Sequence, residues 1–282
     1  MRTIVIIAVI LALVGVGTLI AMFPLRALSL ITSGKGYTVR ADVAYGPLAP
    51  QRLDIYTPDN AKIDAPVVVF FHGGGWRVGE KKEFGFIGQA LASAGVIVVI
   101  PDYRLNPEVV FPEFVRDGAA AVAWAAKNLP GRPLFAAGHS AGAHIAALIA
   151  LDERYLAEAG ASGVLTGMIG LSGPYDFLPL TEERYMRVFP EVTRDESQPI
   201  NFVDGNEPPM LLVTGTADTT VKPGNTTRLA ARIREKGGRV SLKEYPGVSH
   251  LGTMLALAEI LPHTKPPVRD DILAFVDGVS RR

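Results

Sequence analysis

The sequence predicts an α/β fold in which a mostly parallel β-sheet carries helices on both faces. The first observation is a set of short β-branched and aromatic runs without polar alternation, which is typical of strands buried on both faces. Residues 66–71 (PVVVFF) and 96–100 (VIVVI) are the clearest of these runs. The second observation is that amphipathic stretches of helical period separate the runs. This alternation predicts βαβ units, and 282 residues are enough for one large domain.

The elements follow in order along the chain. Residues 37–45 and 52–56 flank Gly46-Pro47 and predict an antiparallel pair at the sheet edge. Further strands are expected at residues 66–71, 96–100, 134–137, 167–171, 210–213 and 240–245. Helices are expected at residues 83–94, 114–128, 141–151, 225–236 and 268–279. Residues 173–209 contain six prolines, so we predict a short insertion there, which either shapes a substrate pocket or forms a long loop.

An apolar segment precedes these elements. Residues 4–23 carry no charge, and in a helix they would span about 30 Å, the thickness of the hydrocarbon core of a bilayer. They account for much of the mean hydropathy of +0.24. We expect a single N-terminal membrane-anchoring helix; a cleaved signal peptide and a buried helix are the alternatives. Residues 1–33 would then be the anchor or signal segment with its linker, and residues 34–282 the folded domain.

Composition excludes several classes of protein and site. The 28 basic and 28 acidic residues balance, so no long-range field attracts a polyanion and nucleic acid is not an expected partner. The chain has no cysteine, which excludes a thiolate nucleophile and a Cys-based zinc site. We find no His, Asp and Glu cluster at metal-ligand spacing and expect neither a metal nor a cofactor.

A serine lies at a predicted turn between a strand and a helix. Gly138-His139-Ser140-Ala141-Gly142 follows an apolar run and opens an alanine-rich stretch. A serine on such an elbow exposes its hydroxyl, and only small neighbours let the backbone turn so tightly. The pentapeptide is a weak signal by itself, but its position between a strand and a helix predicts that Ser140 is a nucleophile.

A glycine-rich turn follows the first buried strand. His72-Gly73-Gly74-Gly75-Trp76 leaves backbone N–H groups unshielded, so that they can point at an oxyanion. The alternatives are a flexible turn and a phosphate-binding loop. A phosphate loop would need Lys-Ser/Thr or a third spaced glycine, and this stretch has neither. We therefore predict an oxyanion hole.

A nucleophilic serine needs a base and an orienting carboxylate. His250 follows the last predicted strand and would lie at the same sheet edge as the elbow, so we predict that it is the base. Asp218 follows the strand at residues 210–213 and is the candidate acid, with Asp176 as its competitor. The remaining histidines are two inside the motifs, one a helical turn beyond the serine, and one late in the chain: His72, His139, His144 and His263.

The chain order Ser140, Asp218, His250 is that of the α/β-hydrolases. Residues 43–275 resemble the serine carboxylesterases typified by hormone-sensitive lipase, and the related feruloyl-esterase-like and kynurenine-formamidase-like hydrolases. Pro101-Asp102-Tyr103-Arg104-Leu105, followed by Phe111-Pro112, is similar to the segment after the glycine motif in that family. The resemblance implies structural roles for Asp102 and Arg104. It also implies an oxyanion hole formed by the N–H groups of Gly74, Gly75 and Ala141.

The same resemblance implies hydrolysis of carboxylic esters through an acyl-enzyme on Ser140. The large amino-terminal cap of lipase-like relatives is absent from this sequence, so we expect small short-chain or aryl esters as substrates. An amidase or formamidase with the same triad is the alternative among enzymes, and an inactive membrane-tethered binding protein is the alternative from another class. We expect membrane contact through residues 4–23 and a catalytic domain outside the cytoplasm, secreted if the segment is cleaved.

Overall fold

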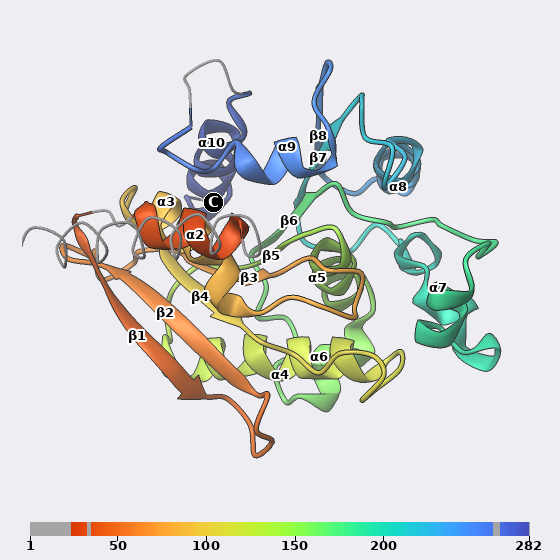
Figure 1. Cartoon of the computed structure of the whole chain (residues 1–282), viewed down its shortest axis with the longest axis horizontal. Helices are drawn as coiled ribbons and strands as arrows, with labels where there is room; N and C mark the ends of the chain where they lie inside the picture. Colours follow the sequence, from red (N-terminus) through yellow and green to blue (C-terminus); the bar gives the residue numbers. More distant parts are fainter. Residues whose placement is uncertain (1–23, 33–34, 262–265, 282) are drawn as a thin grey trace, which may run out of the picture.

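The structure is a computed structural model that describes residues 24–32, 35–261 and 266–281 (Figure 1). The apolar helix predicted at residues 4–23 and the late His263 lie outside the described residues. Among the residues that are described, no helix has both the length and the apolar character needed to cross a membrane.

Eight strands form one sheet in the order β1-β2-β4-β3-β5-β6-β7-β8. They are β1 (Tyr37–Ala44), β2 (Arg52–Pro58), β3 (Val67–Phe71), β4 (Ile97–Pro101), β5 (Leu134–His139), β6 (Gly167–Leu171), β7 (Met210–Gly215) and β8 (Val240–Tyr245). The pairings of β2 with β1 and with β4 are antiparallel, and all the others are parallel. The predicted mostly parallel sheet with an antiparallel pair at its edge is confirmed.

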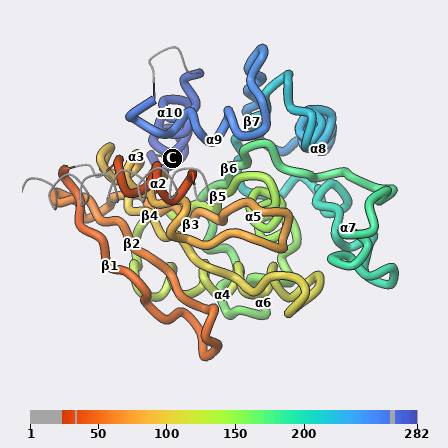
Figure 2. Tube along the Cα trace, in the orientation of Figure 1, coloured from red at the N-terminus to blue at the C-terminus, as the bar shows by residue number. Residues whose placement is uncertain are grey.

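Helices cover both faces of the sheet (Figures 1 and 2). They are α2 (Pro24–Ile31), α3 (Gly85–Ala92), α4 (Glu113–Asn128), α5 (Ala141–Leu151), α6 (Glu153–Glu158), α7 (Glu183–Val188), α8 (Gly224–Glu235), α9 (His250–Leu255) and α10 (Val268–Ser280). One hydrophobic core holds side chains of α4, α5, α6 and α8, and the other holds those of α3, α9 and α10. The side chains of β3 alternate between the two cores, as the pleat requires: Val67, Val69 and Phe71 against Val68 and Phe70.

Several stretches differ from the sequence expectation, and α6 and α9 were not predicted. The predicted helix at residues 83–94 begins as a 3₁₀ turn, η1 (Lys81–Phe84), and continues as α3. Residues 24–31, expected in a linker, form α2, which packs against η1 and α3. The insertion at residues 173–209 contains α7 and the 3₁₀ turns η2 (Glu191–Thr193), η3 (Asp195–Ser197) and η4 (Pro199–Phe202).

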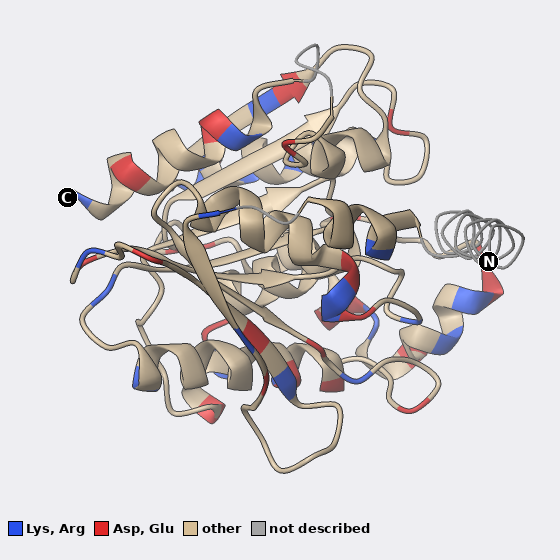
Figure 3. Cartoon of the chain, turned by 60° about the vertical axis from the view of Figure 1, so that its left-hand side comes forward, with Lys and Arg blue, Asp and Glu red and all other residues tan. Residues whose placement is uncertain are grey.

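Positions of basic and acidic residues are intermixed along the chain drawn in Figure 3. Two cations hold the segment after β4. The Lys81 ammonium is buried and lies 3.1 Å from Asp54, while the backbone N–H of Lys81 donates to Asp102 at 2.6 Å. Arg104 forms a two-pronged ion pair with buried Asp117, with both N–O distances 2.8 Å. Asp102 and Arg104 therefore contribute to buried charge networks.

Candidate active site

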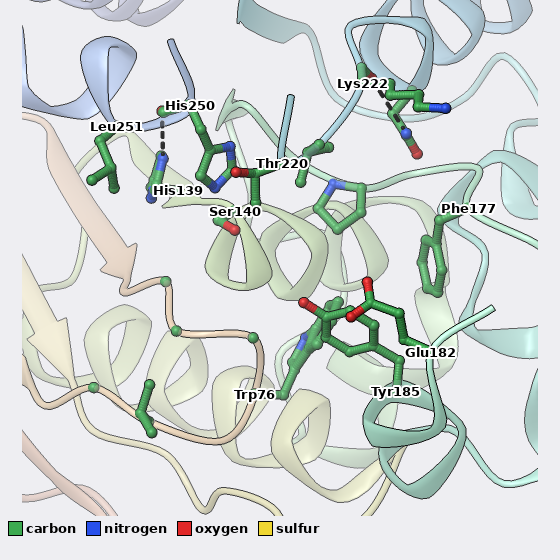
Figure 4. A pocket seen from close by; sticks show the side chains of 18 of the residues that line it. Trp76, His139, Ser140, Phe177, Glu182, Tyr185, Thr220, Lys222, His250 and Leu251 are labelled. Carbon is green, nitrogen blue, oxygen red and sulfur yellow. Dashed lines mark hydrogen bonds between the residues drawn. The ribbon is translucent and has the colours of Figure 1, made fainter. Parts of the chain in front are cut away.

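The three predicted catalytic residues come together at the carboxyl ends of the strands. Ser140 follows β5, Asp218 comes after β7, and His250 comes after β8. Because β5, β6, β7 and β8 are parallel neighbours, these strands end at one edge of the sheet. A cavity of about 680 Å³ opens there, and both Ser140 and His250 line it. Figure 4 shows the Ser140 hydroxyl beside the imidazole of His250.

Ser140 occupies a strained turn between β5 and α5. Its φ of 55° and ψ of −121° lie in a region of backbone conformation that residues other than glycine rarely adopt. The N–H of Ser140 donates to the Leu171 carbonyl at 2.9 Å, which ties the turn to β6. A Cβ at Gly142 would lie 2.0 Å from the Phe71 carbonyl oxygen. The glycine is therefore needed because α5 starts directly against the end of β3.

Asp218 and His250 form the hydrogen-bonded pair that a serine base requires. Asp218 Oδ2 lies 2.8 Å from His250 Nδ1. The other carboxylate oxygen accepts the N–H groups of Thr220 and Val221, each at 2.9 Å. Burial raises the pKa of Asp218, but hydrogen bonds from His250 and this turn outweigh burial and hold the pKa below its ordinary value of 3.8. An ionised Asp218 fixes the proton on Nδ1, so Nε2 is free to accept one.

The competing acid has a different partner. The Asp176 carboxylate forms an ion pair with the Arg228 guanidinium, and the N–H of Asp176 donates to Asn225 at 3.0 Å. Of the two candidate acids, Asp218 contacts the histidine. His250 itself is the first residue of α9. His144 is buried on α5, 2.7 Å from the Ser197 carbonyl.

The glycine turn presents its backbone to the cavity. Gly74 and Gly75 line the cavity and have φ values of +127° and +60°. A Cβ at Gly74 would lie 1.9 Å from the Val78 carbonyl oxygen, so no larger residue fits that turn. Within the described residues, the N–H groups of Gly74 and Gly75 have no acceptor. Ala141 is the first residue of α5, and its N–H is one of the first-turn donors without an intrahelical acceptor.

Two buried histidines hold these parts together, and the sequence did not indicate that role. His139 Nε2 lies 3.1 Å from the His250 carbonyl and thereby ties the elbow to α9. Burial lowers the pKa of His139 to about 3, and nearby His250 acts in the same direction, so His139 is a neutral donor. The His72 ring stacks on Tyr103 at 4.4 Å, and the Tyr103 hydroxyl donates to the His72 carbonyl at 2.8 Å. The only sequence signal was the position of both histidines inside the motifs.

The cavity has two unlike sides. The predicted insertion forms one side, where Tyr185 meets the Trp76 ring edge-on at 6.0 Å and Phe177 and Glu182 lie nearby. Of the two interpretations of residues 173–209, the pocket-shaping one is observed. The opposite side is mostly apolar and includes a residue of α2 that sequence reasoning missed: Leu25, Val78, Phe84, Leu251 and Met254.

Comparison with known sequences finds the same family over most of the chain. The BD-FAE family model matches residues 53–233. Isoprenylcysteine alpha-carbonyl methylesterase ICME from Arabidopsis thaliana is 28% identical over 278 residues, covering 86% of this chain and 64% of the relative. Esterase LipC from Mycobacterium tuberculosis is 32% identical over 242 residues, covering 76% and 60%. Kynurenine formamidase from Salmo salar is 34% identical over 142 residues, covering 49% and 47%. The chain thus spans less than two thirds of the length of these relatives.

Solved structures share the fold. Esterase B from Lactobacillus rhamnosis superposes with a TM-score of 0.77 at 20% identity, covering 95% of each chain. The metagenomic carboxylesterase EstE1 gives a TM-score of 0.76 at 21% identity, covering 91% of this chain and 94% of EstE1. At 20–21% identity these structures establish the fold alone. The family membership comes from the sequence match to the family model. The chain belongs to the BD-FAE family of α/β-hydrolase esterases.

Proposed function

We propose that this protein is a serine hydrolase of carboxylic esters. The observation that carries the proposal is the Asp218–His250 pair at 2.8 Å, beside Ser140 on its strained elbow. Gly74 and Gly75 line the same cavity, and within the described residues their N–H groups have no acceptor, which supports a site for the oxyanion at this turn. The esterase names of ICME and LipC support the same class.

The proposed reaction has two acyl-transfer steps. The Ser140 oxygen attacks the ester carbonyl while His250 Nε2 takes the hydroxyl proton. The oxyanion of the tetrahedral intermediate accepts hydrogen bonds from the N–H groups of Gly74, Gly75 and Ala141. His250 then gives the proton to the leaving alcohol, which departs as the carbon–oxygen bond breaks. Water, deprotonated by His250, attacks the acyl-enzyme and releases the acid and Ser140. Asp218 remains ionised throughout and stabilises the imidazolium.

We propose short-chain or aryl esters as substrates. The insertion places the rings of Phe177 and Tyr185 beside Trp76, which follows the glycine turn, on the side of the cavity where a planar or short substituent would rest. A formamidase is the second candidate, because the kynurenine formamidase of Salmo salar is 34% identical over about half of this chain. The same triad cleaves an amide when His250 can protonate the departing amine.

The test compares an ester and a formamide on the purified chain and on Ser140→Ala. We expect p-nitrophenyl acetate hydrolysis by the unsubstituted chain and a loss of at least about 10³-fold in the variant, because the nucleophile is gone. Faster release of formate from an aryl formamide than of acetate from the ester would favour the formamidase. No hydrolysis of either compound would favour a binding protein on an inactive hydrolase scaffold.

We also propose that residues 4–23 anchor the protein in a membrane with the catalytic domain outside the cytoplasm. The support is the length of this uncharged segment, which matches the thickness of a bilayer. The full chain should float with phosphatidylcholine vesicles in a density gradient and resist extraction by high salt. Recovery in the soluble fraction with a new amino terminus near Ser29 would indicate cleavage of a signal peptide instead.

A further inference from the structure

The helix α2 forms part of the wall of the catalytic cavity. Leu25, in its first turn, lines the same cavity as Ser140 and His250. Ser29 docks the helix: its hydroxyl donates to the Glu83 carbonyl at 2.9 Å and accepts the N–H of Phe86 at 3.2 Å. The Ser29 carbonyl also accepts from Gln89 at 3.0 Å. This short helix is therefore a fixed part of the catalytic domain (Figure 1).

The last two side chains of α2 are apolar and exposed. Leu30 and Ile31 are 63% and 60% exposed, although Leu25 and Ser29 of the same helix contact the cavity and the domain. A helix on the surface of a soluble domain normally carries polar residues on its outer face. The chain immediately before Pro24 is the uncharged segment of residues 4–23. An apolar outer face that continues such a segment is typical of a helix lying in a membrane interface.

Two exposed apolar side chains mark the cavity entrance near α2. Val78 and Leu251 both line the cavity and are 65% and 49% exposed. Within the described residues, the neighbouring exposed cations Arg77 and Lys82 have no carboxylate within ion-pair distance, whereas Arg26 pairs with Glu80 at 3.3 Å. Free cations beside an apolar surface match the phosphates and acyl chains of a lipid headgroup region.

We propose that the cavity opens onto a lipid bilayer and takes its ester substrates from it, with α2 lying in the interface. The substrate class is a short-acyl ester of an apolar alcohol, whose chain passes from the bilayer between Val78 and Leu251 and along Leu25 to Ser140. This inference rests on the proposed esterase activity and on the membrane anchor. It adds where the substrate comes from and which residues admit it.

The test uses two acetate esters that form the same acetyl-enzyme. The full chain is reconstituted in phosphatidylcholine vesicles, and acetate release is followed from dodecyl acetate dissolved in the bilayer and from p-nitrophenyl acetate in the buffer. Because deacylation is common to both esters, a difference between them reports the alcohol moiety and its route. The variant Leu30→Ser/Ile31→Ser changes the outer face of α2, which lies outside the cavity lining. Ile63→Ser is the matched control, 91% exposed on the loop before β3 at the other edge of the sheet.

We expect the double variant to lose about tenfold in kcat/KM for dodecyl acetate, with p-nitrophenyl acetate changed by less than about twofold. Ile63→Ser should change neither rate. Unchanged dodecyl acetate hydrolysis, or equal loss with both esters, would overturn the proposal. Loss of a dimer in the double variant without an effect on dodecyl acetate would also overturn it, because a second copy of the chain would then cover this face. Undiminished p-nitrophenyl acetate hydrolysis by Ser140→Ala would instead refute the proposed esterase.

Discussion

At the scale of single residues, the proposed mechanism depends on which imidazole nitrogen of His250 carries the proton. Asp218 accepts from Nδ1 and uses its second oxygen for two backbone N–H groups, so its orientation is fixed from both sides. This arrangement leaves Nε2 free to accept a proton, and the proposed mechanism takes that proton from Ser140. The two nitrogens of one ring then have different roles.

Asp218→Asn tests that assignment. The amide oxygen would keep the bonds to the Thr220 and Val221 N–H groups, so the amide nitrogen would face His250 and favour the tautomer with the proton on Nε2. We expect kcat for p-nitrophenyl acetate to fall by about 10⁴-fold with little change in fold. Asp176, whose carboxylate pairs with Arg228, provides the matched variant Asp176→Asn. We expect its kcat for p-nitrophenyl acetate to fall by less than about tenfold. The opposite ranking would make Asp176 the acid.

The places of single residues were predictable only where turn chemistry or strand order determined them. The meeting of Ser140, Asp218 and His250 follows from the turn after β5 and from the order of strands, which brings distant residues to one sheet edge. The bond from His139 to the His250 carbonyl joins residues 111 positions apart and has no sequence pattern. The place of Leu25 in the cavity wall likewise depends on how α2 docks, which no local pattern encodes.

At the scale of elements, strands were more predictable than short helices. The buried runs at β3 and β4 are long, β-branched and apolar on both faces, so burial and propensity agree. By contrast, α2 and α7 have eight and six residues, too few to be stable without tertiary contacts. The prolines around α7 indicate loops and turns, and tertiary contacts order that segment, among them the contact of Tyr185 with Trp76 and the hydrogen bond from the Phe111 N–H to the Val188 carbonyl.

Ser29→Ala tests how α2 is held. The change removes the acceptor for the Phe86 N–H near the start of α3 and the donor to the Glu83 carbonyl. We expect the free energy of unfolding to fall by about 1–2 kcal/mol, measured by urea denaturation. Because Glu83 and Phe84 line the cavity, KM should rise more than kcat falls.

The control for that prediction is Ser93→Ala at the end of α3. Ser93 is exposed, and its hydroxyl contacts the Ala90 carbonyl and Glu259 at the surface. We expect the free energy of unfolding to change by less than about 0.5 kcal/mol. A loss in Ser29→Ala no larger than in Ser93→Ala would show that α2 docks by apolar contacts alone.

At the scale of the whole molecule, three histidines are buried as neutral groups beside the cavity. Burial lowers the pKa of His72 to about 4, of His139 to about 3 and of His144 to about 4, from an ordinary 6.5. In the unfolded chain these histidines bind protons below about pH 6.5, whereas in the folded chain they stay neutral until about pH 4. The free energy of unfolding therefore falls as the pH drops below about 6.5. Burial raises the pKa of Asp102 to about 6, so the folded chain takes up this proton before the unfolded chain does. This one group stabilises the fold as the pH falls, against the three histidines that destabilise it.

We therefore expect the free energy of unfolding to decrease by several kcal/mol between pH 7 and pH 5, because each buried histidine costs about 1.4 kcal/mol per pH unit below its unfolded pKa. Urea denaturation at a series of pH values measures this slope. His144→Gln keeps a donor for the Ser197 carbonyl but cannot be protonated, so its slope should be shallower. A free energy of unfolding that does not change between pH 7 and pH 5 would mean that these histidines are protonated in the folded state.

The architecture of the whole domain was largely readable from the sequence, because a parallel sheet buried on both faces produces long apolar strands and regular helical spacing. What could not be read was the shape of the cavity, since α2, the glycine turn and the insertion come from three separate parts of the chain. Their meeting point depends on tertiary packing.

Reaction with a fluorophosphonate probe tests the central claim most directly, because such a probe forms a stable phosphonyl ester only with an activated serine and releases fluoride. Intact and peptide mass spectrometry of the full chain should show one adduct, located on Ser140. Ser140→Ala should show none, and Asp218→Asn should react far more slowly. An unlabelled chain, or an adduct on another serine that persists in Ser140→Ala, would contradict the assignment of Ser140, Asp218 and His250 as a catalytic triad.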